Sequence, residues 1–405
     1  MKGINLFITA FIMLIITPDL SGQDWTQFRG TERNGKVTGF KAPAAWPAEL
    51  KQIWKINVGP CDATPVLAGG KIYLHTRQGN EEVVTCLDAV TGKEIWRYGY
   101  AAPAVTGPAT SHPGPRSTPV MADGKIITLG VAGTLSCLDA STGKLLWQKG
   151  DTLFPDTQFF TGMSPVVVDG ICIVQQGGKE NGFVVAYNLK TGDEKWRYSG
   201  EGPAYGSPSV MAIDKAKQLV LVTEKSLLGL NCADGKLLWK TDATCQQRFY
   251  NASSPVIDGG KIYISGAGTG TKAISIIKKG NQFTVKELWN NPEVGAKWNT
   301  AILKDGFLYG FSDQKRIYCL DVSTGKSAWT DNTVNSDFAT IVDCGPVIIG
   351  LPSTGNLIVL KPDSKAYTEI KKYKVAETPV YSFPVIAGNV IYVKDAESLM
   401  MYRIE

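Results

Sequence analysis

The sequence predicts an all-β protein, an eight-bladed β-propeller built from four-stranded antiparallel blades. Three observations lead to this prediction. A motif that ends in tryptophan recurs at intervals of 40 to 51 residues, the spacing of propeller blades. Glycine and tryptophan are abundant, at 43 and 10 residues, which suits many short strands joined by tight turns. Finally, eight units of this kind fit between residue 52 and the last residue.

The repeated motif is clearest in two consecutive copies. Leu87 to Trp96 reads LDAVTGKEIW, and Leu138 to Trp147 reads LDASTGKLLW. In each copy the Asp can cap a turn with its side chain, and the Gly supplies a residue with positive φ before the fourth strand. The large indole ring is expected to lie buried between neighbouring blades, as a structural residue. The tryptophans expected to dock blades in this way are Trp54, Trp96, Trp147, Trp196, Trp239, Trp289 and Trp329.

The ring is predicted to close by strand exchange between the two ends of the propeller. Units open with Ser/Thr-Pro-Val, as at Thr64–Val66, where a proline suits the first residue of a strand. The eighth unit, which begins near Tyr381, supplies only three strands before Glu405. Residues 52–58 are therefore expected to pair with residues 399–405 as the missing fourth strand, because otherwise a long sheet edge would be exposed.

The chain divides into three parts. Residues 1–22 resemble a cleaved secretory signal peptide, with Lys2 before an apolar stretch of 14 residues from Ile4 to Thr17, too short to span a bilayer. Residues 23–51 form an N-terminal arm and residues 52–405 the propeller. We expect a periplasmic or secreted protein with no transmembrane helix after signal cleavage; a signal retained as a membrane anchor is the alternative.

Charge and cysteine content exclude some classes of protein. The net charge is +5, with 42 basic and 37 acidic residues interleaved and no basic stripe, so nucleic acid is not an expected partner. Cys86, Cys137 and Cys319 occupy one equivalent strand position in three different units, too far apart for disulfide bonds. Most of the eight cysteines are therefore interpreted as buried free thiols. A disulfide remains open among Cys61, Cys172, Cys232, Cys245 and Cys344.

The repeats also carry a family resemblance. The stretch Leu-Asp-Ala-x-Thr-Gly-Lys-x-x-Trp resembles the tryptophan-docking motif of quinoprotein dehydrogenases, and it is similar to the repeats of the propeller lipoprotein in the outer-membrane β-barrel assembly machinery. Residues 24–30 and 114–119 resemble a large bacterial group with quinone-binding-like propeller repeats. The resemblance covers nearly the whole mature chain and implies an eight-bladed fold. The resemblance to the dehydrogenases also implies pyrroloquinoline quinone with calcium, and Asn251 is a candidate ligand of the calcium ion. The adjacent Cys-Cys pair of those enzymes is missing from this sequence.

The histidines do not indicate a catalytic or metal site. The two histidines, His75 and His112, fall in different units, so no haem-attachment motif, zinc motif or histidine-based triad can be assembled. We expect His75 to be structural. His112 lies in the long loop 101–115, where we expect it to be a solvated residue at the rim of the propeller. No catalytic residue and no metal site are assigned.

The candidate site is the mouth of the central channel, because the first strand of every blade lines the channel and the residues that precede it converge at one end. Arg116 and Lys297 are expected to attract an anion, and Trp298 or Tyr205 to stack on a flat ring. The alternative is that these side chains pair with one another and plug a water-filled channel. The predicted ligand-binding residues are Asp62, Arg116, Tyr205, Arg248, Asn251, Lys297, Trp298, Asn299, Asp337 and Tyr381.

The sequence favours a non-catalytic interaction or ligand-binding scaffold in the cell envelope. The expected partner is an envelope protein or a small, planar, anionic ligand, and the expected state is a monomer. Two alternatives stay open at this point. One is an alcohol or sugar oxidoreductase that depends on pyrroloquinoline quinone, and the other is a module that binds glycans or polymers.

Overall fold

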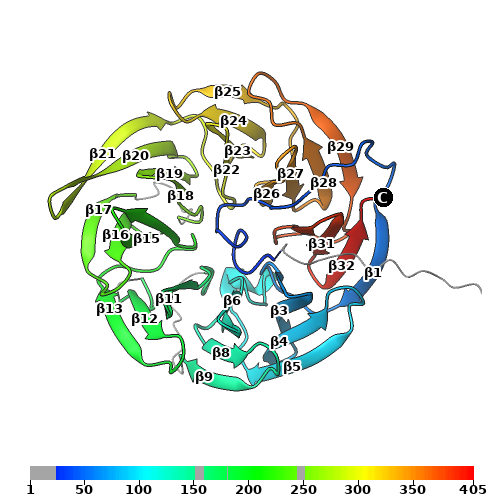
Figure 1. Ribbon diagram of the computed structural model, residues 1–405, viewed down its shortest axis with the longest axis horizontal. Helices are drawn as coiled ribbons and strands as arrows, with labels where there is room; N and C mark the ends of the chain where they lie inside the picture. The colour runs from blue at the N-terminus through cyan, green and yellow to red at the C-terminus, as the bar shows by residue number, and fades with distance from the viewer. Residues whose placement is uncertain (1–23, 151–158, 180, 244–250) are drawn as a thin grey trace, which may run out of the picture.

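The described chain is a ring of eight four-stranded antiparallel sheets around a central channel, as Figure 1 shows. The computed structural model describes residues 24–150, 159–179, 181–243 and 251–405. The predicted fold class is confirmed. In the described part of the chain, no helix is long and apolar enough to cross a membrane.

The first four blades each run from the channel outward in chain order. Blade 1 contains β2 (Val66–Ala68), β3 (Lys71–Gln78), β4 (Glu81–Asp88) and β5 (Glu94–Ala101), followed by the short 3-10 helix η1 (Gly107–Ser111). Blade 2 contains β6 (Val120–Ala122), β7 (Lys125–Leu129), β8 (Leu135–Asp139) and β9 (Leu145–Lys149). Blade 3 contains β10 (Val166–Val168), β11 (Ile171–Gln176), β12 (Phe183–Asn188) and β13 (Glu194–Ser199). Blade 4 contains β14 (Ser209–Ile213), β15 (Ala216–Val222), β16 (Ser226–Asn231) and β17 (Leu237–Asp242).

The remaining blades repeat this order, and the last borrows its outer strand from the N-terminal side. Blade 5 contains β18 (Val256–Asp258), β19 (Lys261–Gly266), β20 (Gly270–Lys279) and β21 (Gln282–Asn291). Blade 6 contains β22 (Ile302–Lys304), β23 (Phe307–Phe311), β24 (Ile317–Asp321) and β25 (Ser327–Thr330). Blade 7 contains β26 (Ala339–Asp343), β27 (Ile348–Pro352), β28 (Asn356–Leu360) and β29 (Glu369–Lys374). Blade 8 contains β30 (Val385–Ala387), β31 (Val390–Lys394), β32 (Ser398–Arg403) and β1 (Lys51–Asn57).

Closure of the ring takes the form that the sequence predicts. β1 pairs antiparallel with β32, with Trp54 opposite Met401 and Ile56 opposite Leu399. The blade therefore has the order β1-β32-β31-β30, in which only the outermost strand comes from the other end of the propeller. This pairing covers the sheet edge that β32 would otherwise expose.

The Leu-Asp motif forms the turn between the third and fourth strands. In blade 1 the Oδ1 atom of Asp88 accepts hydrogen bonds from the backbone N–H of Thr91 at 2.8 Å and from its hydroxyl at 2.7 Å. Gly92 follows with a φ of +69°, a conformation that L side chains disfavour. β5 then pairs with β4 through a bulge, because Cys86 lies opposite Trp96 and Leu87 opposite Glu94, which leaves Ile95 as the extra residue. The Asp and the Gly thus set the turn that aims each outer strand.

The cysteines are packed as small apolar side chains. Cys86, Cys137 and Cys319 are fully buried on the third strands of three different blades. All cysteines among the described residues are free and buried, and Cys245 lies outside those residues. Burial raises the pKa of the Cys137 thiol to about 12, which keeps it protonated and unreactive.

The N-terminal arm crosses one end of the channel. Trp25 forms an antiparallel bridge with Leu67 of blade 1, and Lys36 forms a parallel bridge with Asp343 of blade 7. Between these two attachments the arm runs across the centre of the ring, as the dark blue segment of Figure 1 shows. The arm is therefore part of the propeller's packing and crosses the channel at the end opposite the predicted mouth.

Candidate functional site

A cavity of about 400 Å³ opens at the predicted mouth. Its wall contains one equivalent residue from the start of every blade, and in blades 1 to 7 a Ser or Thr follows two positions later. These eight residues are Asp62, Arg116, Gly162, Tyr205, Ala252, Trp298, Phe338 and Tyr381. Side chains from the whole length of the propeller therefore meet in one cavity because all eight inner strands start around a single axis.

A row of hydroxyl groups lies beneath these residues and joins blade 8 to blade 1 and each of blades 1 to 5 to the blade that follows. The backbone N–H of Thr118 donates to Ser164 Oγ at 3.0 Å, and the N–H of Ser164 donates to Ser207 Oγ at 2.9 Å. The same contact recurs between other blades, and the N–H of Phe383 donates to Thr64 Oγ1 at 3.0 Å, which links blade 8 to blade 1. The other hydroxyls that accept in this way belong to Thr118, Ser254 and Thr300.

This row of hydroxyl contacts was not predicted, although the repeated Ser or Thr that forms it is visible in the sequence. The Ser or Thr before each Pro-Val was interpreted only as the start of a strand. In the structure its hydroxyl satisfies a backbone donor of the preceding blade, which is buried away from water. The repeated Ser/Thr is thus a contact between blades as well as a strand start.

Asp62, His112 and Arg116 form a connected polar group on one side of the cavity. The Nδ1 atom of His112 lies 2.7 Å from Oδ2 of Asp62, and the Nη2 atom of Arg116 donates to the backbone oxygen of His112 at 2.7 Å. His112 is therefore not the solvated rim residue that the sequence suggested, since its loop, after η1, folds into the cavity wall. Burial lowers the pKa of Arg116 from its usual value, and the charges of Asp62 and Tyr205 partly oppose this.

Aromatic rings continue the wall beyond His112, which meets the ring of Tyr381 edge to face at 4.7 Å. Trp298 stacks on Phe338 with ring centres 5.4 Å apart and planes 8° from parallel, and Phe338 meets Tyr381 edge to face at 5.2 Å. Phe159 contacts the ring of Trp298 at 6.1 Å, and its backbone N–H donates to the Tyr205 hydroxyl at 3.1 Å. These rings make the wall largely apolar, and one face of Trp298 is already covered by Phe338.

Two buried polar groups in the wall have unsatisfied atoms. The side-chain Oδ1 and Nδ2 atoms of Asn299 have no hydrogen-bond partner, and the residue is only 5% exposed. The Nη1 atom of Arg116 is likewise buried without a partner. Buried polar atoms normally find a partner, so each of these atoms is a place where a ligand or water can bind.

Other predicted site residues lie outside the cavity wall. Lys297 pairs with Asp337 at 3.0 Å, and Phe338 takes the wall position that the sequence analysis gave to Asp337. The amide of Asn251 turns away and donates to the backbone oxygens of Thr223 and Ala243 at 2.8 and 2.7 Å. These three predicted positions therefore do not line the mouth. Arg248 lies outside the described residues.

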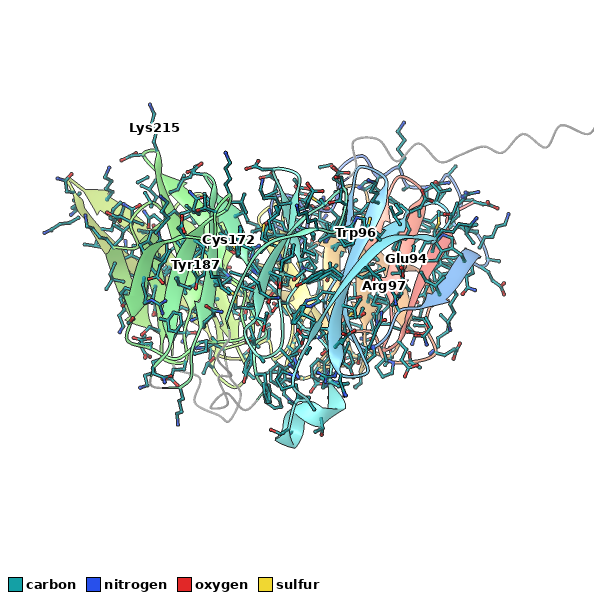
Figure 2. All side chains as sticks on the ribbon, turned by 90° about the horizontal axis from the view of Figure 1, so that it is seen from below. Glu94, Trp96, Arg97, Cys172, Tyr187 and Lys215 are labelled. Carbon is teal, nitrogen blue, oxygen red and sulfur yellow. The ribbon has the colours of Figure 1, made fainter. Side chains whose placement is uncertain are left out.

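The repeated tryptophans lie at the contacts between blades. The indole N–H of Trp96 donates to the backbone oxygen of Ala140 in blade 2 at 3.1 Å, and that of Trp147 to Leu189 in blade 3 at 3.0 Å. Figure 2 labels Trp96 beside Glu94 and Arg97 on the outer strand of blade 1. The same bond to the next blade is made by Trp54, Trp196, Trp289 and Trp329.

Trp239 departs from this pattern. Its indole N–H donates to Oε1 of Gln218 in its own blade at 2.7 Å, and the ring packs over Gly229. Blade 5 continues as the long hairpin of β20 and β21, whose turn contains Gly280 in place of the Leu-Asp motif. The preceding tryptophan therefore lacks the acceptor that the motif provides elsewhere.

Fold and repeats define the class to which this protein belongs, that of the eight-bladed propellers docked by tryptophan motifs. A family model described as outer membrane protein assembly factor BamB matches residues 34–199 and 80–331. Together these matches span most of the chain, and the chain belongs to this family. Among the described residues, no group of three or more His, Cys, Asp or Glu side chains is placed to hold a metal ion.

Comparison with individual proteins shows two kinds of relative. The chain is 22% identical over 362 residues to the outer membrane protein assembly factor BamB of Burkholderia pseudomallei. This alignment covers 85% of each of the two chains. It is 32% identical over 157 residues to the quinohemoprotein alcohol dehydrogenase ADH IIB of Pseudomonas putida, but there it covers 38% of this chain and 21% of the enzyme.

Solved structures agree on the fold. The crystal structure of the quinohemoprotein alcohol dehydrogenase from Comamonas testosteroni superposes with a TM-score of 0.68 and 15% identity, covering 94% of this chain and 80% of the enzyme. At that level of identity the likeness shows a shared propeller fold and no more.

Proposed function

We propose that this protein is an exported, non-catalytic scaffold of the bacterial cell envelope that holds a protein partner or a small ligand. The observation that carries the proposal is the extent of the likeness to the assembly factor, 85% of both chains, against 21% of the alcohol dehydrogenase. The sequence supports export, through residues 1–22, which resemble a cleaved signal peptide.

The chemistry of the mouth supports binding over catalysis. In its wall Asp62 contacts His112, and beside the wall Lys297 pairs with Asp337. Such contacts help to hold the wall in a defined shape. A wall of this kind is suited to recognition by shape and by a few polar contacts.

The residues at the mouth do not fit the quinone and calcium that the dehydrogenase resemblance implies. One face of Trp298 is covered by Phe338, so the stacking face expected for a flat cofactor is partly occupied. Lys297 is paired with Asp337 outside the cavity wall, and Asn251 donates to backbone oxygens. We therefore derive no redox step for this protein.

Site-specific photo-crosslinking in the native host tests the scaffold role. A photoreactive residue at exposed Thr110 in η1 reports on the mouth face, and one at exposed Lys215 reports on the opposite face, from which Lys215 projects in Figure 2. The proposal expects a discrete crosslink from at least one face to an envelope protein identified by mass spectrometry. No crosslink from either face, together with alcohol oxidation by purified protein supplied with quinone and calcium, would overturn it.

A second candidate is the binding of a small planar carboxylate at the mouth. The unpartnered Nη1 atom of Arg116 and the unpartnered amide of Asn299 belong to residues that line an aromatic cavity of about 400 Å³, which favours such a ligand. Titration with benzoate should show saturable binding that Arg116→Gln weakens. Arg97→Gln is the matched control because Arg97 is exposed on β5 and pairs with Glu94. Equal affinity in both variants would contradict the assignment.

A further inference from the structure

A second cavity, of about 580 Å³, lies at the other end of the channel, between the N-terminal arm and the inner strands of blades 3, 4 and 5. The arm contributes Gln27, Arg29, Glu32, Arg33 and Lys36 to its wall. The whole wall contains four basic and two acidic side chains. Lys217 and Asp258 come from the blades, and the other four come from the arm. The cavity is therefore cationic as well as concave.

Arg29 is a buried cation with no acidic partner. Its side chain is only 2% exposed, and its Nη2 atom donates to the backbone oxygens of Ala301 at 2.7 Å and Asn34 at 3.3 Å. The Nε atom is buried with no hydrogen-bond partner. Among the described residues, no carboxylate forms an ion pair with this guanidinium, so its charge is met by carbonyl dipoles alone. A buried charge balanced in this way is costly.

Arg33 lies close to Arg29, is partly buried and, among the described residues, also forms no ion pair with a carboxylate. It donates to the backbone oxygens of Pro208, through Nε at 3.0 Å and Nη2 at 2.7 Å, and of Pro165, through Nη1 at 3.0 Å. Its remaining bond goes to the amide oxygen of Gln27 at 3.1 Å. Burial and the neighbouring charge of Arg29 lower the pKa of Arg33 to about 9, which still leaves both side chains charged at neutral pH.

Both guanidinium groups have N–H donors that form no hydrogen bond within the protein. A guanidinium carries five N–H donors in a fixed plane. The hydrogen bonds of Arg29 all come from Nη2, and one Nη2 donor of Arg33 remains after its four bonds. Because the two residues line the same cavity, free donors and uncompensated positive charge coincide there.

We propose that the cavity between the arm and blades 3 to 5 binds a small oxyanion, the phosphate or carboxylate group of a soluble ligand, through Arg29 and Arg33. An oxyanion supplies the two things that the site lacks, negative charge and several acceptors in the plane of a guanidinium. Binding there also fastens the arm, because Arg29 and Arg33 connect it to blades 3, 4 and 6. The site is separate from the mouth and does not depend on the scaffold role.

Calorimetric titration of the mature protein with inorganic phosphate and with acetate tests this proposal, with chloride keeping the ionic strength constant. At least one of the two anions is expected to bind saturably, and Arg33→Gln is expected to weaken binding roughly tenfold, as loss of a charge-assisted contact does. Lys41→Gln is the matched control, since it removes one positive charge from an exposed position on the arm outside this cavity.

Two results would overturn the proposal. One is the absence of saturable binding by either anion, and the other is equal affinity in wild type and Arg33→Gln. If Arg33→Gln fails to fold, selenate soaked into crystals of the wild type gives a direct readout. An anomalous peak beside Arg29 and Arg33 is the expected result, and an empty cavity at a concentration where phosphate saturates the protein in solution would refute the site.

Discussion

The Nδ1 atom of His112 lies 2.7 Å from the Oδ2 atom of Asp62, although the two residues are 50 positions apart in the chain. Asp62 precedes the inner strand of blade 1, and His112 follows η1 in the connection to blade 2. The backbone oxygen of His112 in turn accepts from Arg116, so the contact holds the connecting loop against the mouth. One wall of the candidate site is thus built by a loop that has no counterpart in the repeat.

Removal of β1 should destroy cooperative folding. A deletion of residues 23–58 takes away the strand that pairs with β32, and the exposed edge should cause aggregation or a broad thermal transition. A deletion of residues 23–49 is the control, because it removes the arm but keeps β1. Thermal melting followed by circular dichroism, with size-exclusion chromatography, distinguishes them. A larger deletion that melts like the smaller one would contradict closure by β1.

Truncation of an indole between blades should be among the most destabilising single changes. Trp147 is 8% exposed and bonds to Leu189 of blade 3, so Trp147→Ala should lower the free energy of unfolding by about 3–5 kcal/mol. Leu146→Ala is the neighbouring control, since Leu146 is 43% exposed and should change stability by less than about 0.5 kcal/mol. Urea denaturation measures both. Similar losses in the two variants would show that the indole does not join the blades.

The glycine beneath each indole should tolerate no side chain. A Cβ atom on Gly192, whose φ is +76°, would lie 2.9 Å from the ring of Trp147. Gly124 has a similar φ of +69° but open space around it, so Gly124→Ala carries only the backbone strain, about 1–2 kcal/mol. Gly192→Ala should cost clearly more, as measured by urea denaturation. Equal costs would mean that the ring shifts freely.

Stability should fall in mild acid because of His75. This side chain is fully buried, and its Nε2 atom lies 3.2 Å from the Tyr100 hydroxyl and 3.6 Å from Glu82 Oε2. Burial lowers the pKa of His75, and the charge of Glu82 only partly opposes this. The unfolded chain therefore binds a proton more readily than the folded protein, so this contribution to stability decreases as the pH falls below about 6.5, the ordinary histidine value.

The comparison that checks this uses His75→Gln. Urea denaturation of both proteins between mildly alkaline and mildly acidic pH should show a smaller decrease in the free energy of unfolding for the variant. Carboxylates that titrate at lower pH contribute to both proteins and cancel in the difference. Parallel pH profiles would show that His75 takes up a proton in the folded protein as readily as in the unfolded chain.

The architecture of the propeller could be predicted from the sequence because most blades repeat the same short motif of turn and strand residues. The Asp and Gly of the turn and the Trp of the outer strand act within one unit, and their period gives the number of blades. Closure by β1 followed from counting strands in the last unit. These inferences needed only local chemistry and the requirement that a sheet edge be covered.

The candidate site was predicted less completely. The strand starts could be placed at the mouth, and the predicted residues that lie in the cavity wall are Asp62, Arg116, Tyr205, Trp298, Asn299 and Tyr381. Blade 7 lacks the Ser/Thr-Pro signal, so its register was misplaced by one residue, and Asp337 was expected where Phe338 lies. His112 and Phe159 reach the wall from loops, whose paths depend on tertiary contacts that no repeat encodes.

The N-terminal arm contributes to the cavities at both ends of the central channel. Phe28 lines the mouth cavity, and the next residue, Arg29, lines the cationic cavity, so the arm passes between them. A change in the path of this one short segment would therefore alter the shape of both cavities together.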